Sequence, residues 1–444
     1  MGFNLPCGPA LCGALALGLL LCSHSAAGDT YFVSTTGDDG NPGTQQQPWR
    51  TLQHAADAVA AGDTVFVLPG AFAGFDLRRA GTPDQPITFS AQPGTTIDQD
   101  NPVTPDGINL EGVSYVVVEG FEVVGATRAG IRAALCHHVT IRGNRTDLNG
   151  KWGIFTGFCD DLRIEANQCS RSALEHGIYV SNSGDRPAIR GNLIWSNHGN
   201  GIHINGDLSQ GGDGVITGAV VERNIVFDNG AGGGSGINAD GVQDSRFQNN
   251  LLFQNHASGI SLYRIDGGAP SSGNQVLHNT VLQASDGRWG LNIRDASGGN
   301  TIYNNIFYNL HSFRGSISID ADSLPGTVSD HNAVMDRFTT DGGDTILSLA
   351  AWRAATGLDL HSILSTPAAL FADWLQADYH LAPGSPAIDL GTAALAPPAD
   401  LEGTPRPIGP GYDAGAYEYT RALFAAPGAG GASRIRRLSP QLAP

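Results

Sequence analysis

The stretch EHGIYVSNSGDRPAIRGNLIWSNHGNGIHIN, residues 175–205, contains one phrase twice. Each copy has Gly-Ile followed by an alternation of polar and apolar residues, and Tyr179 stands in the first copy where His203 stands in the second. Gly177 and Gly201 are 24 positions apart, which is far too short for a domain and indicates a structural repeat. The alternation predicts a strand with one buried face.

The same phrase returns along most of the chain. Each copy is preceded, roughly ten residues earlier, by an Asn that follows a short apolar alternation, so one period holds two or three short strands between Gly and Asn turns. One such period cannot bury its own apolar face, but stacked periods can. We therefore predict an all-β fold, a single-stranded right-handed parallel β-helix over residues 75–332, in which the Asn side chains hydrogen-bond from coil to coil. The repeats begin at Gly107, Gly130, Gly153, Gly177, Gly201, Gly236, Gly259, Gly290 and Gly315, and the Asn column is Asn144, Asn167, Asn192, Asn224, Asn250, Asn279 and Asn305.

The ends and the longer spacings have their own signals. Residues 29–74 contain helical spacing between Pro48 and Asp63, which predicts a helix that caps the N-terminal end. Residues 333–420 are predicted to form a C-terminal cap region, and residues 421–444 a low-complexity tail. The segments GDLSQGGDGVITG and IDGGAPSSGN lengthen two periods, and we expect them to project as loops from one side.

Composition excludes some functions and localises the chain. The net charge is −17 with a single lysine, Lys151, so a nucleic-acid partner is not expected. Residues 1–28 combine a short apolar run with a small-residue cleavage site, which predicts a signal peptide and a secreted or periplasmic protein without stable membrane insertion. Cleavage would leave Cys136, Cys159 and Cys169, and the first two are expected to stack on adjacent coils as thiols rather than as a disulfide.

Several motifs carry a family resemblance. The opening YFVSTTGDDGNPGTQQQPWRTLQHAADAVAAGDTVFVLPGAF and the closing pair HLAPGSPAIDLG and DAGAYEY resemble the ends of secreted bacterial β-helix proteins. The coils of the form N-x-x-x-x-N-x-x-x-G-I are similar to those of mannuronan C5-epimerases and polysaccharide lyases, within the pectate-lyase-like superfamily. The resemblance implies the fold and a carbohydrate substrate. It transfers no catalytic set, because the Asp-Pro-His, Lys-Ser and Arg-His-Gly motifs of the alginate and chondroitin enzymes are missing.

The candidate site therefore comes from the alternation within the coil. If the Ile of Gly-Ile points inward, the residue after it points outward, which places Tyr179 and His203 one coil apart on one face and within about 10 Å. Tyr and His suit proton transfer, while Arg and Lys suit a carboxylate. We predict catalytic roles for Tyr179, His203, Lys151 and Arg264, and substrate-binding roles for His176, Asn205, Asn238, Asp240, Tyr263, Arg288 and Arg294.

These residues favour one function and leave others open. The leading hypothesis is an exported polysaccharide lyase that cleaves a uronate-containing acidic polysaccharide by β-elimination. The alternatives are a C5-epimerase on the same substrates, a glycoside hydrolase pairing Asp240 with Asp207, Asp244 or Glu175, and a carbohydrate-binding surface protein. Lys151 could equally form a surface ion pair with Glu175. No metal ligands are identified, although Ca²⁺ could bridge an acidic polymer to protein carboxylates. The sequence gives no indication of an oligomeric state.

Overall fold

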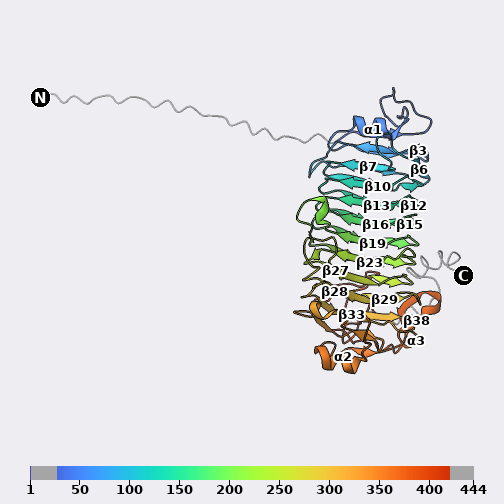
Figure 1. Ribbon diagram of the computed structural model, residues 1–444. Helices are drawn as coiled ribbons and strands as arrows, with labels where there is room; N and C mark the ends of the chain where they lie inside the picture. The colour runs from blue at the N-terminus through green and yellow to red at the C-terminus, as the bar shows by residue number, and fades with distance from the viewer. Residues whose placement is uncertain (2–27, 421–444) are drawn as a thin grey trace.

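The computed structural model describes residues 28–420, together with Met1, and shows a continuous parallel β-helix (Figure 1). Three long parallel sheets run along its length, so the predicted fold is confirmed. The sheets continue unbroken through both long spacings. Apart from Met1 and Gly28, the predicted signal peptide lies outside the described residues, and so does the predicted low-complexity tail. Within the described part, no helix has the length and apolar character needed to cross a membrane.

Each sheet takes one strand from almost every coil, which explains why a strand pairs with its equivalent in the next coil rather than with its neighbour in sequence. Sheet 1 contains β1 (Thr30–Val33), β2 (Thr64–Val67), β5 (Ile87–Ala91), β8 (Val116–Glu119), β11 (Thr140–Arg142), β14 (Arg163–Glu165), β17 (Ala188–Arg190), β21 (Val220–Glu222), β25 (Arg246–Gln248), β28 (Gln275–Leu277), β31 (Thr301–Tyr303) and β34 (Val328–Asp330). Sheet 2 contains β4 (Phe75–Leu77), β7 (Ile108–Glu111), β10 (Ala129–Ala134), β13 (Trp152–Gly157), β16 (Ile178–Ser181), β19 (Ile202–Asn205), β23 (Ile237–Asp240), β27 (Ile260–Tyr263), β30 (Leu291–Ile293), β33 (Ile317–Ile319) and β36 (Phe338–Thr339). Sheet 3 contains β3 (Gly70–Ala73), β6 (Thr95–Gln99), β9 (Glu122–Val124), β12 (Arg145–Asp147), β15 (Gln168–Ser170), β18 (Leu193–Trp195), β22 (Ile225–Phe227), β26 (Leu251–Phe253), β29 (Thr280–Gln283), β32 (Ile306–Asn309), β35 (Ala333–Val334) and β37 (Ile363–Leu364).

The recurring Gly-Ile marks the corner that leads into sheet 2. A Cβ atom on Gly177 would lie 2.5 Å from Cγ2 of Ile194 and 2.9 Å from the carbonyl oxygen of Gly201 on the next coil. Any larger residue would push neighbouring coils apart, because real Cβ atoms do not approach backbone oxygens so closely. The Ile that follows points inward, and Ile178 and Ile202 are fully buried. The repeat therefore combines a corner that needs close backbone approach with a core position.

The predicted Asn column is confirmed as a buried amide ladder. Each Asn donates through Nδ2 to Oδ1 of the Asn on the next coil at 3.0–3.1 Å, from Asn144 to Asn332. The same Oδ1 also accepts the backbone N–H of the preceding coil's Asn, as between Asn144 and Asn167 at 3.0 Å. These bonds satisfy turn groups that water cannot reach. A second, shorter ladder joins Asn197, Asn229 and Asn255.

Helices lie at the two ends of the coil stack (Figure 1). The helix expected between Pro48 and Asp63 is α1 (Leu52–Ala58), which begins after Thr51, whose hydroxyl accepts the backbone N–H of His54. Leu52, Ala55 and Ala56 join the main core. At the far end, α2 (Leu349–Thr356) buries Trp352 against Phe338 of the last coil, with ring centroids 5.2 Å apart.

The C-terminal region does more than the predicted cap. Residues 371–420, which we call the strap, follow the short α3 (Pro367–Leu370) and include the antiparallel pair β38 (Phe371–Asp373) and β39 (Asp378–Leu381). Figure 1 shows α3 and β38 on the flank of the coils near β29, rather than across the end. The strap forms a second apolar core with outward residues of sheet 3, among them Trp195, Phe227 and Phe253. Within the expected cap region, residues 333–420, α2 thus lies at the end of the coils, whereas the strap covers outward apolar residues of sheet 3.

A line of turn residues between sheets 1 and 3 fastens the strap. These residues occupy equivalent positions on successive coils and share the left-handed backbone conformation. Each donates a side-chain hydrogen bond of 2.7–3.1 Å to a strap carbonyl oxygen. The pairs are Arg223 with Leu401, Asn249 with Ala399, His278 with Asp413, Asn304 with Thr392 and His331 with Leu390.

The cysteine prediction is also confirmed. Cys136, Cys159 and Cys169 are free and buried. The backbone N–H of Cys136 donates to Sγ of Cys159 at 3.3 Å, as expected for stacked positions on adjacent coils. The thiols act as small core residues.

Candidate active site on sheet 2

Tyr179 and His203 lie side by side on the outward face of sheet 2. Strands β16 and β19 pair with Tyr179 opposite His203, and the two rings stack with centroids 4.8 Å apart and planes 9° apart. The separation is well within the predicted 10 Å. Phe155 continues the column on the preceding coil, and its ring meets Tyr179 edge-on at 5.5 Å. Trp152 contacts both, at 4.6 Å from Phe155 and 5.9 Å from Tyr179.

His176 and His203 form a hydrogen-bonded pair whose direction can be assigned. The backbone N–H of Asn200 donates to Nδ1 of His176 at 3.0 Å, so that nitrogen carries no proton. The proton of neutral His176 is then on Nε2, which lies 3.0 Å from Nδ1 of His203 and donates to it. His203 in turn carries its proton on Nε2, which is buried and has no hydrogen-bond partner among the described residues. The chain of bonds therefore ends in an unsatisfied N–H on the site face.

The same arrangement keeps both imidazoles neutral. Burial lowers the pKa of His176 to about 4, and burial together with the neighbouring His176 holds the pKa of His203 well below its usual value. An added proton on either ring would also have to displace one of the two existing hydrogen bonds. Burial raises the pKa of Tyr179 to about 12, although its hydroxyl accepts a bond from Nδ2 of Asn205 at 3.3 Å. At neutral pH, Tyr179 is consequently a proton donor.

Lys151 lies at the edge of this cluster. Its ammonium is 3.4 Å from Oε1 of Glu175 and 5.1 Å from the Trp152 ring centroid. The other carboxylate oxygen of Glu175 accepts the indole N–H of Trp152 at 2.8 Å. The surface ion pair considered from the sequence is thus present, and the catalytic role of Lys151 stays a prediction.

The loop after Asn205 and the loop after Tyr263 contact each other. Leu208 donates its backbone N–H to the carbonyl of Asp266 at 2.9 Å, and Gly268 donates to Gly214 at 2.7 Å, so the long insertions of two coils pair with each other. The expectation that both project from one side agrees with this pairing. A short parallel ladder between β20 (Ile216–Thr217) and β24 (Val242–Gln243) lies next to them.

Asp240 holds the loop that follows Tyr263. Its carboxylate accepts the backbone N–H groups of Ile265, Asp266 and Gly267 at 2.9–3.0 Å, and the residue is only 1% exposed. Burial nevertheless raises its pKa, against the three hydrogen bonds. This carboxylate is occupied by the loop, so the substrate-binding role of Asp240 and its part in the hydrolase alternative stay predictions that would require the loop to open.

The outward column is less exposed than alternation suggested. Asn205 is 3% exposed and Asn238 9%. Asn238 donates to the hydroxyl of Tyr263 at 2.6 Å, and burial raises the pKa of that phenol. Outward direction on a strand does not ensure exposure, because neighbouring side chains and loops on the same face cover one another.

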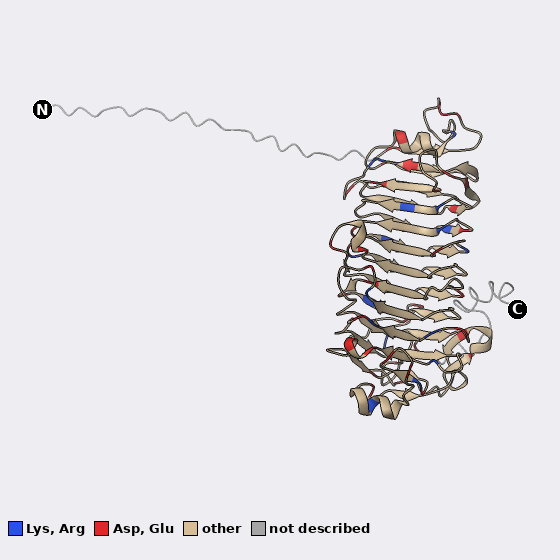
Figure 2. Ribbon diagram, viewed as in Figure 1, with Lys and Arg blue, Asp and Glu red and all other residues tan. Residues whose placement is uncertain are grey.

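The three predicted arginines have different surroundings. Arg294 is paired with Asp320 at 2.9 Å. Arg264 and Arg288 are exposed, and within the described residues neither has an ion-pair partner. Toward the N-terminal end, Arg132 is bound to Asn109 and Glu111. In Figure 2, charged residues are sparse on the middle strands of sheet 2. Arg264, directly after Tyr263, and Arg288 are thus the two predicted arginines that have no ion-pair partner among the described residues.

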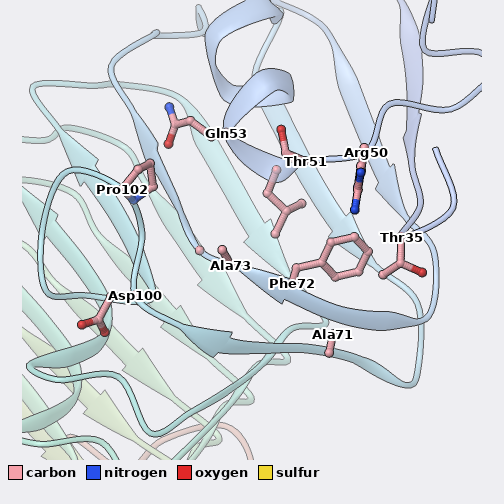
Figure 3. Close-up of a pocket in the computed structure, with 11 residues that line it drawn as sticks. Thr35, Arg50, Thr51, Gln53, Ala71, Phe72, Ala73, Asp100 and Pro102 are labelled. Atoms are coloured by element: carbon pink, nitrogen blue, oxygen red, sulfur yellow. The ribbon is translucent and has the colours of Figure 1, made fainter. Parts of the chain in front are cut away.

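A cavity that the sequence did not indicate lies at the N-terminal end of the β-helix. It has a volume of about 550 Å³ and lies between the start of α1, β3 and the loop containing Asp100 and Pro102 (Figure 3). Arg50 and Asp100 are its only charged lining residues, and it contains no His, Tyr or Lys. It is separate from the Tyr179/His203 cluster and lacks groups suited to proton transfer near neutral pH.

Comparison with known proteins agrees with the fold. Residues 31–274 match the family described as Pel9A-like, right handed beta helix region. An uncharacterized protein of Bacillus subtilis (strain 168), YwoF, is 25% identical over 82% of this chain and 93% of its own length.

Solved structures show the same architecture at low identity. The pectate lyase Pel9A superposes with a TM-score of 0.58 at 17% identity, covering 88% of this chain and 96% of its own. A rhamnogalacturonan lyase has a TM-score of 0.53 at 16% identity, with coverage of 69% and 87%. An alginate lyase from Paenibacillus sp. str. FPU-7 has a TM-score of 0.51 at 19% identity, with coverage of 65% and 97%.

The molecule is therefore a right-handed parallel β-helix protein with a cluster of ionisable rings on one sheet. More specifically, the chain belongs to the Pel9A-like family of right-handed β-helix regions.

Proposed function

We propose that this chain is an exported polysaccharide lyase that acts on a uronate-containing polymer at the outward face of β13, β16, β19 and β27. The observation that carries the proposal is the stacked Tyr179/His203 pair, which holds two proton donors beside an aromatic surface. The named activities of the solved β-helix relatives, on pectate, rhamnogalacturonan and alginate, support the substrate class.

β-Elimination requires that the substrate carboxylate is neutralised, that the C5 proton is abstracted and that the departing glycosidic oxygen is protonated. Different residues suit each of these tasks. The substrate carboxylate must be neutralised, and exposed Arg264 can bind it without breaking an existing ion pair. The departing glycosidic oxygen must be protonated, and Tyr179 carries its proton at neutral pH because its pKa is about 12. Trp152 and Phe155 offer apolar ring surfaces against which a sugar can stack.

The tautomers change the role that we assign to His203. Since its free nitrogen already carries a proton, His203 acts as a hydrogen-bond donor rather than as the base. A buried N–H without a partner costs about 1–3 kcal/mol, which a substrate oxygen would relieve after a small rotation of the covering side chains. Abstraction of the C5 proton then falls to the amine of Lys151, whose side chain must first leave its contact with Glu175.

A substrate panel tests the proposal. The purified protein is incubated with polygalacturonate, rhamnogalacturonan, alginate and a neutral glucan, and unsaturated uronate products are measured by ultraviolet absorbance beside reducing ends. We expect unsaturated products from one acidic polymer and none from the glucan. Reducing ends without unsaturation would indicate a hydrolase, a changed C5 configuration in the recovered polymer an epimerase, and binding without turnover a carbohydrate-binding protein. Each of these outcomes would overturn the lyase.

Ca²⁺ dependence is part of the same proposal. The charges of Asp207, Glu175 and Asp266 add to the effect of burial in raising the pKa of Tyr179. A divalent cation could bridge such carboxylates to a uronate polymer. Assays with added Ca²⁺ and with a chelator decide whether the cation is required.

A further inference from the structure

Two histidines on the last coils lie one above the other because of strand register. Ala333 in β35 pairs with Ile363 in β37, so His331 and His361, each two residues earlier, occupy equivalent positions. Their rings stack with centroids 5.1 Å apart and planes 15° apart. The register of the paired strands β35 and β37 brings these side chains together.

Asp330, the last residue of β34, completes the group. Its Oδ2 lies 2.6 Å from Nδ1 of His361, and its Oδ1 accepts the backbone N–H of His361 at 2.6 Å and that of His331 at 2.9 Å. One ligand atom from each of the three residues lies within 4.8 Å of the others. Within residues 28–420, this is the group of three possible ligands that meets this distance.

The ring of His331 is already oriented. Its Nδ1 donates to the carbonyl oxygen of Leu390 in the strap at 2.9 Å, so the proton of the neutral ring is on Nδ1 and the lone pair is on Nε2. Metal-binding histidines commonly use such a bond from the second nitrogen to a backbone carbonyl. The strap therefore supplies the outer support that a metal ligand requires.

We propose that Asp330, His331 and His361 bind a divalent transition-metal ion of the Zn²⁺ type. Two imidazoles and one carboxylate favour Zn²⁺ and its neighbours over Ca²⁺ or Mg²⁺, which prefer oxygen ligands. Three protein ligands leave a fourth position for water. The bonds of about 2.0–2.2 Å that zinc forms require the three ligand atoms to draw closer. His361 can make that movement because its side chain is 67% exposed, and it exchanges its bond to Asp330 for the metal.

Other histidines beside acidic residues differ in an informative way. His256 contacts Asp286 through Nδ1 at 2.9 Å and Asp228 through Nε2 at 3.2 Å. His380 likewise contacts Asp378 and Glu402 through its two nitrogens. Both nitrogens of each imidazole are in use, and within the described residues neither ring stacks on a second histidine. His256 thus provides a matched control.

The role implied by the position is structural. A bound ion would join the end of sheet 1, the turn before β37 and, through Leu390, the strap. The site is at the C-terminal end of the coils, remote from Tyr179, and it stands whether or not the lyase assignment holds.

Zinc binding tests the inference directly. The untagged full chain is treated with a chelator, transferred to metal-free buffer and titrated with Zn²⁺ by calorimetry, and its melting temperature is followed in parallel. We expect one equivalent to bind and, at about 100 times the Kd, the melting temperature to rise by roughly 5 °C. His331→Gln and His361→Gln should each weaken binding by about 10-fold or more, whereas His256→Gln should leave it unchanged.

The variants also show how the inference would fail. If the wild-type chain binds no Zn²⁺, or if both Gln variants bind it as well as wild type, the site does not exist. If His256→Gln lowers affinity as much as His361→Gln, the ion binds elsewhere, and if Ca²⁺ competes equally, the metal class is wrong. His331→Gln also loses the bond to Leu390, so a folding defect there leaves exposed His361→Gln as the deciding variant.

Discussion

The outward faces of sheets 2 and 3 solve the same packing problem in different ways. On sheet 3, Trp195, Phe227 and Phe253 form a stacked column, with Phe227 and Phe253 centroids 4.8 Å apart, and the strap buries it. On sheet 2, Phe155, Tyr179 and His203 form a similar column that changes from an apolar ring to polar rings, and within residues 28–420 no strap covers it. Stacked rings follow from strand register on both faces. What differs is the cover, and the face without one is the face available to a ligand.

The largest expected effect is on the covered face. Phe253→Ala removes a fully buried ring that also contacts Tyr379 of the strap at 5.0 Å, and should cost about 3–5 kcal/mol of unfolding free energy. Phe155→Ala on the open face should cost much less, because that ring is only partly buried. Denaturant titration of both variants measures the difference. Equal losses would contradict the distinction between the two faces.

The next effect is on turnover. Tyr179→Phe keeps the ring and its stacking but removes the proton donor, so kcat/KM should fall by about 10²–10⁴-fold while stability changes by about 1 kcal/mol. The control is Tyr303→Phe on sheet 1, which should leave turnover unchanged. Initial rates of unsaturated product on the substrate found in the panel measure both. Full activity in Tyr179→Phe would remove this residue from the mechanism.

The stability contributions of His176 on sheet 2 and His380 in the strap should respond to pH in opposite directions. The folded-state pKa of His176 is about 4, below the unfolded value of 6.5, so its contribution to stability is complete above pH 6.5 and is lost as the pH falls through 4. Burial alone would lower the pKa of His380 in the strap, but its hydrogen bonds to Asp378 and Glu402 outweigh burial and raise it to about 9. That contribution is complete below pH 6.5 and is lost as the pH rises through 9.

Two variants test these signs. His176→Gln should flatten the acid side of the plot of melting temperature against pH, and His380→Gln should flatten the alkaline side. Each substitution removes a pH-dependent contribution of at most about 3 kcal/mol to the unfolding free energy. Melting curves of wild type and both variants across this pH range provide the data. If both substitutions alter the same side, the assigned directions are wrong.

The smallest stability effect concerns Lys151. Its ion pair with Glu175 is partly exposed to water, so Lys151→Met should change the unfolding free energy by less than about 1 kcal/mol. Arg142→Met, which breaks an exposed pair with Glu119 on sheet 1, is the matched control and should behave alike in stability. Only Lys151→Met should abolish turnover. Activity that survives this change would leave the ion pair as the whole role of Lys151.

The coil architecture could be predicted because it depends on local, repeated requirements. Gly177 and its equivalents allow the corner, the Ile after it fills the interior, and Asn192 and its equivalents bond between turns, so each period carries the full signal. The proximity of Tyr179 and His203 follows from the same period.

Contacts between segments that are distant in sequence could not be predicted from the repeat. The enclosure of Asp240 depends on where a loop 25 residues later turns back, as its bond to the backbone of Ile265 shows. The direction of the His176–His203 bond depends on one backbone N–H, that of Asn200. The position of the strap on the flank of sheet 3 could not be predicted, because its apolar residues do not reveal which surface they cover.

The position of the strap at the end of the chain has a consequence for the order of assembly. Every coil up to β32 is complete in sequence well before Tyr379 and Tyr417, which cover the flank of those coils. During synthesis and refolding, coils can stack as they form, yet Phe227 and Phe253 stay in contact with water until the final segment arrives. The period of greatest risk of self-association thus falls after the helix has formed and before the strap closes.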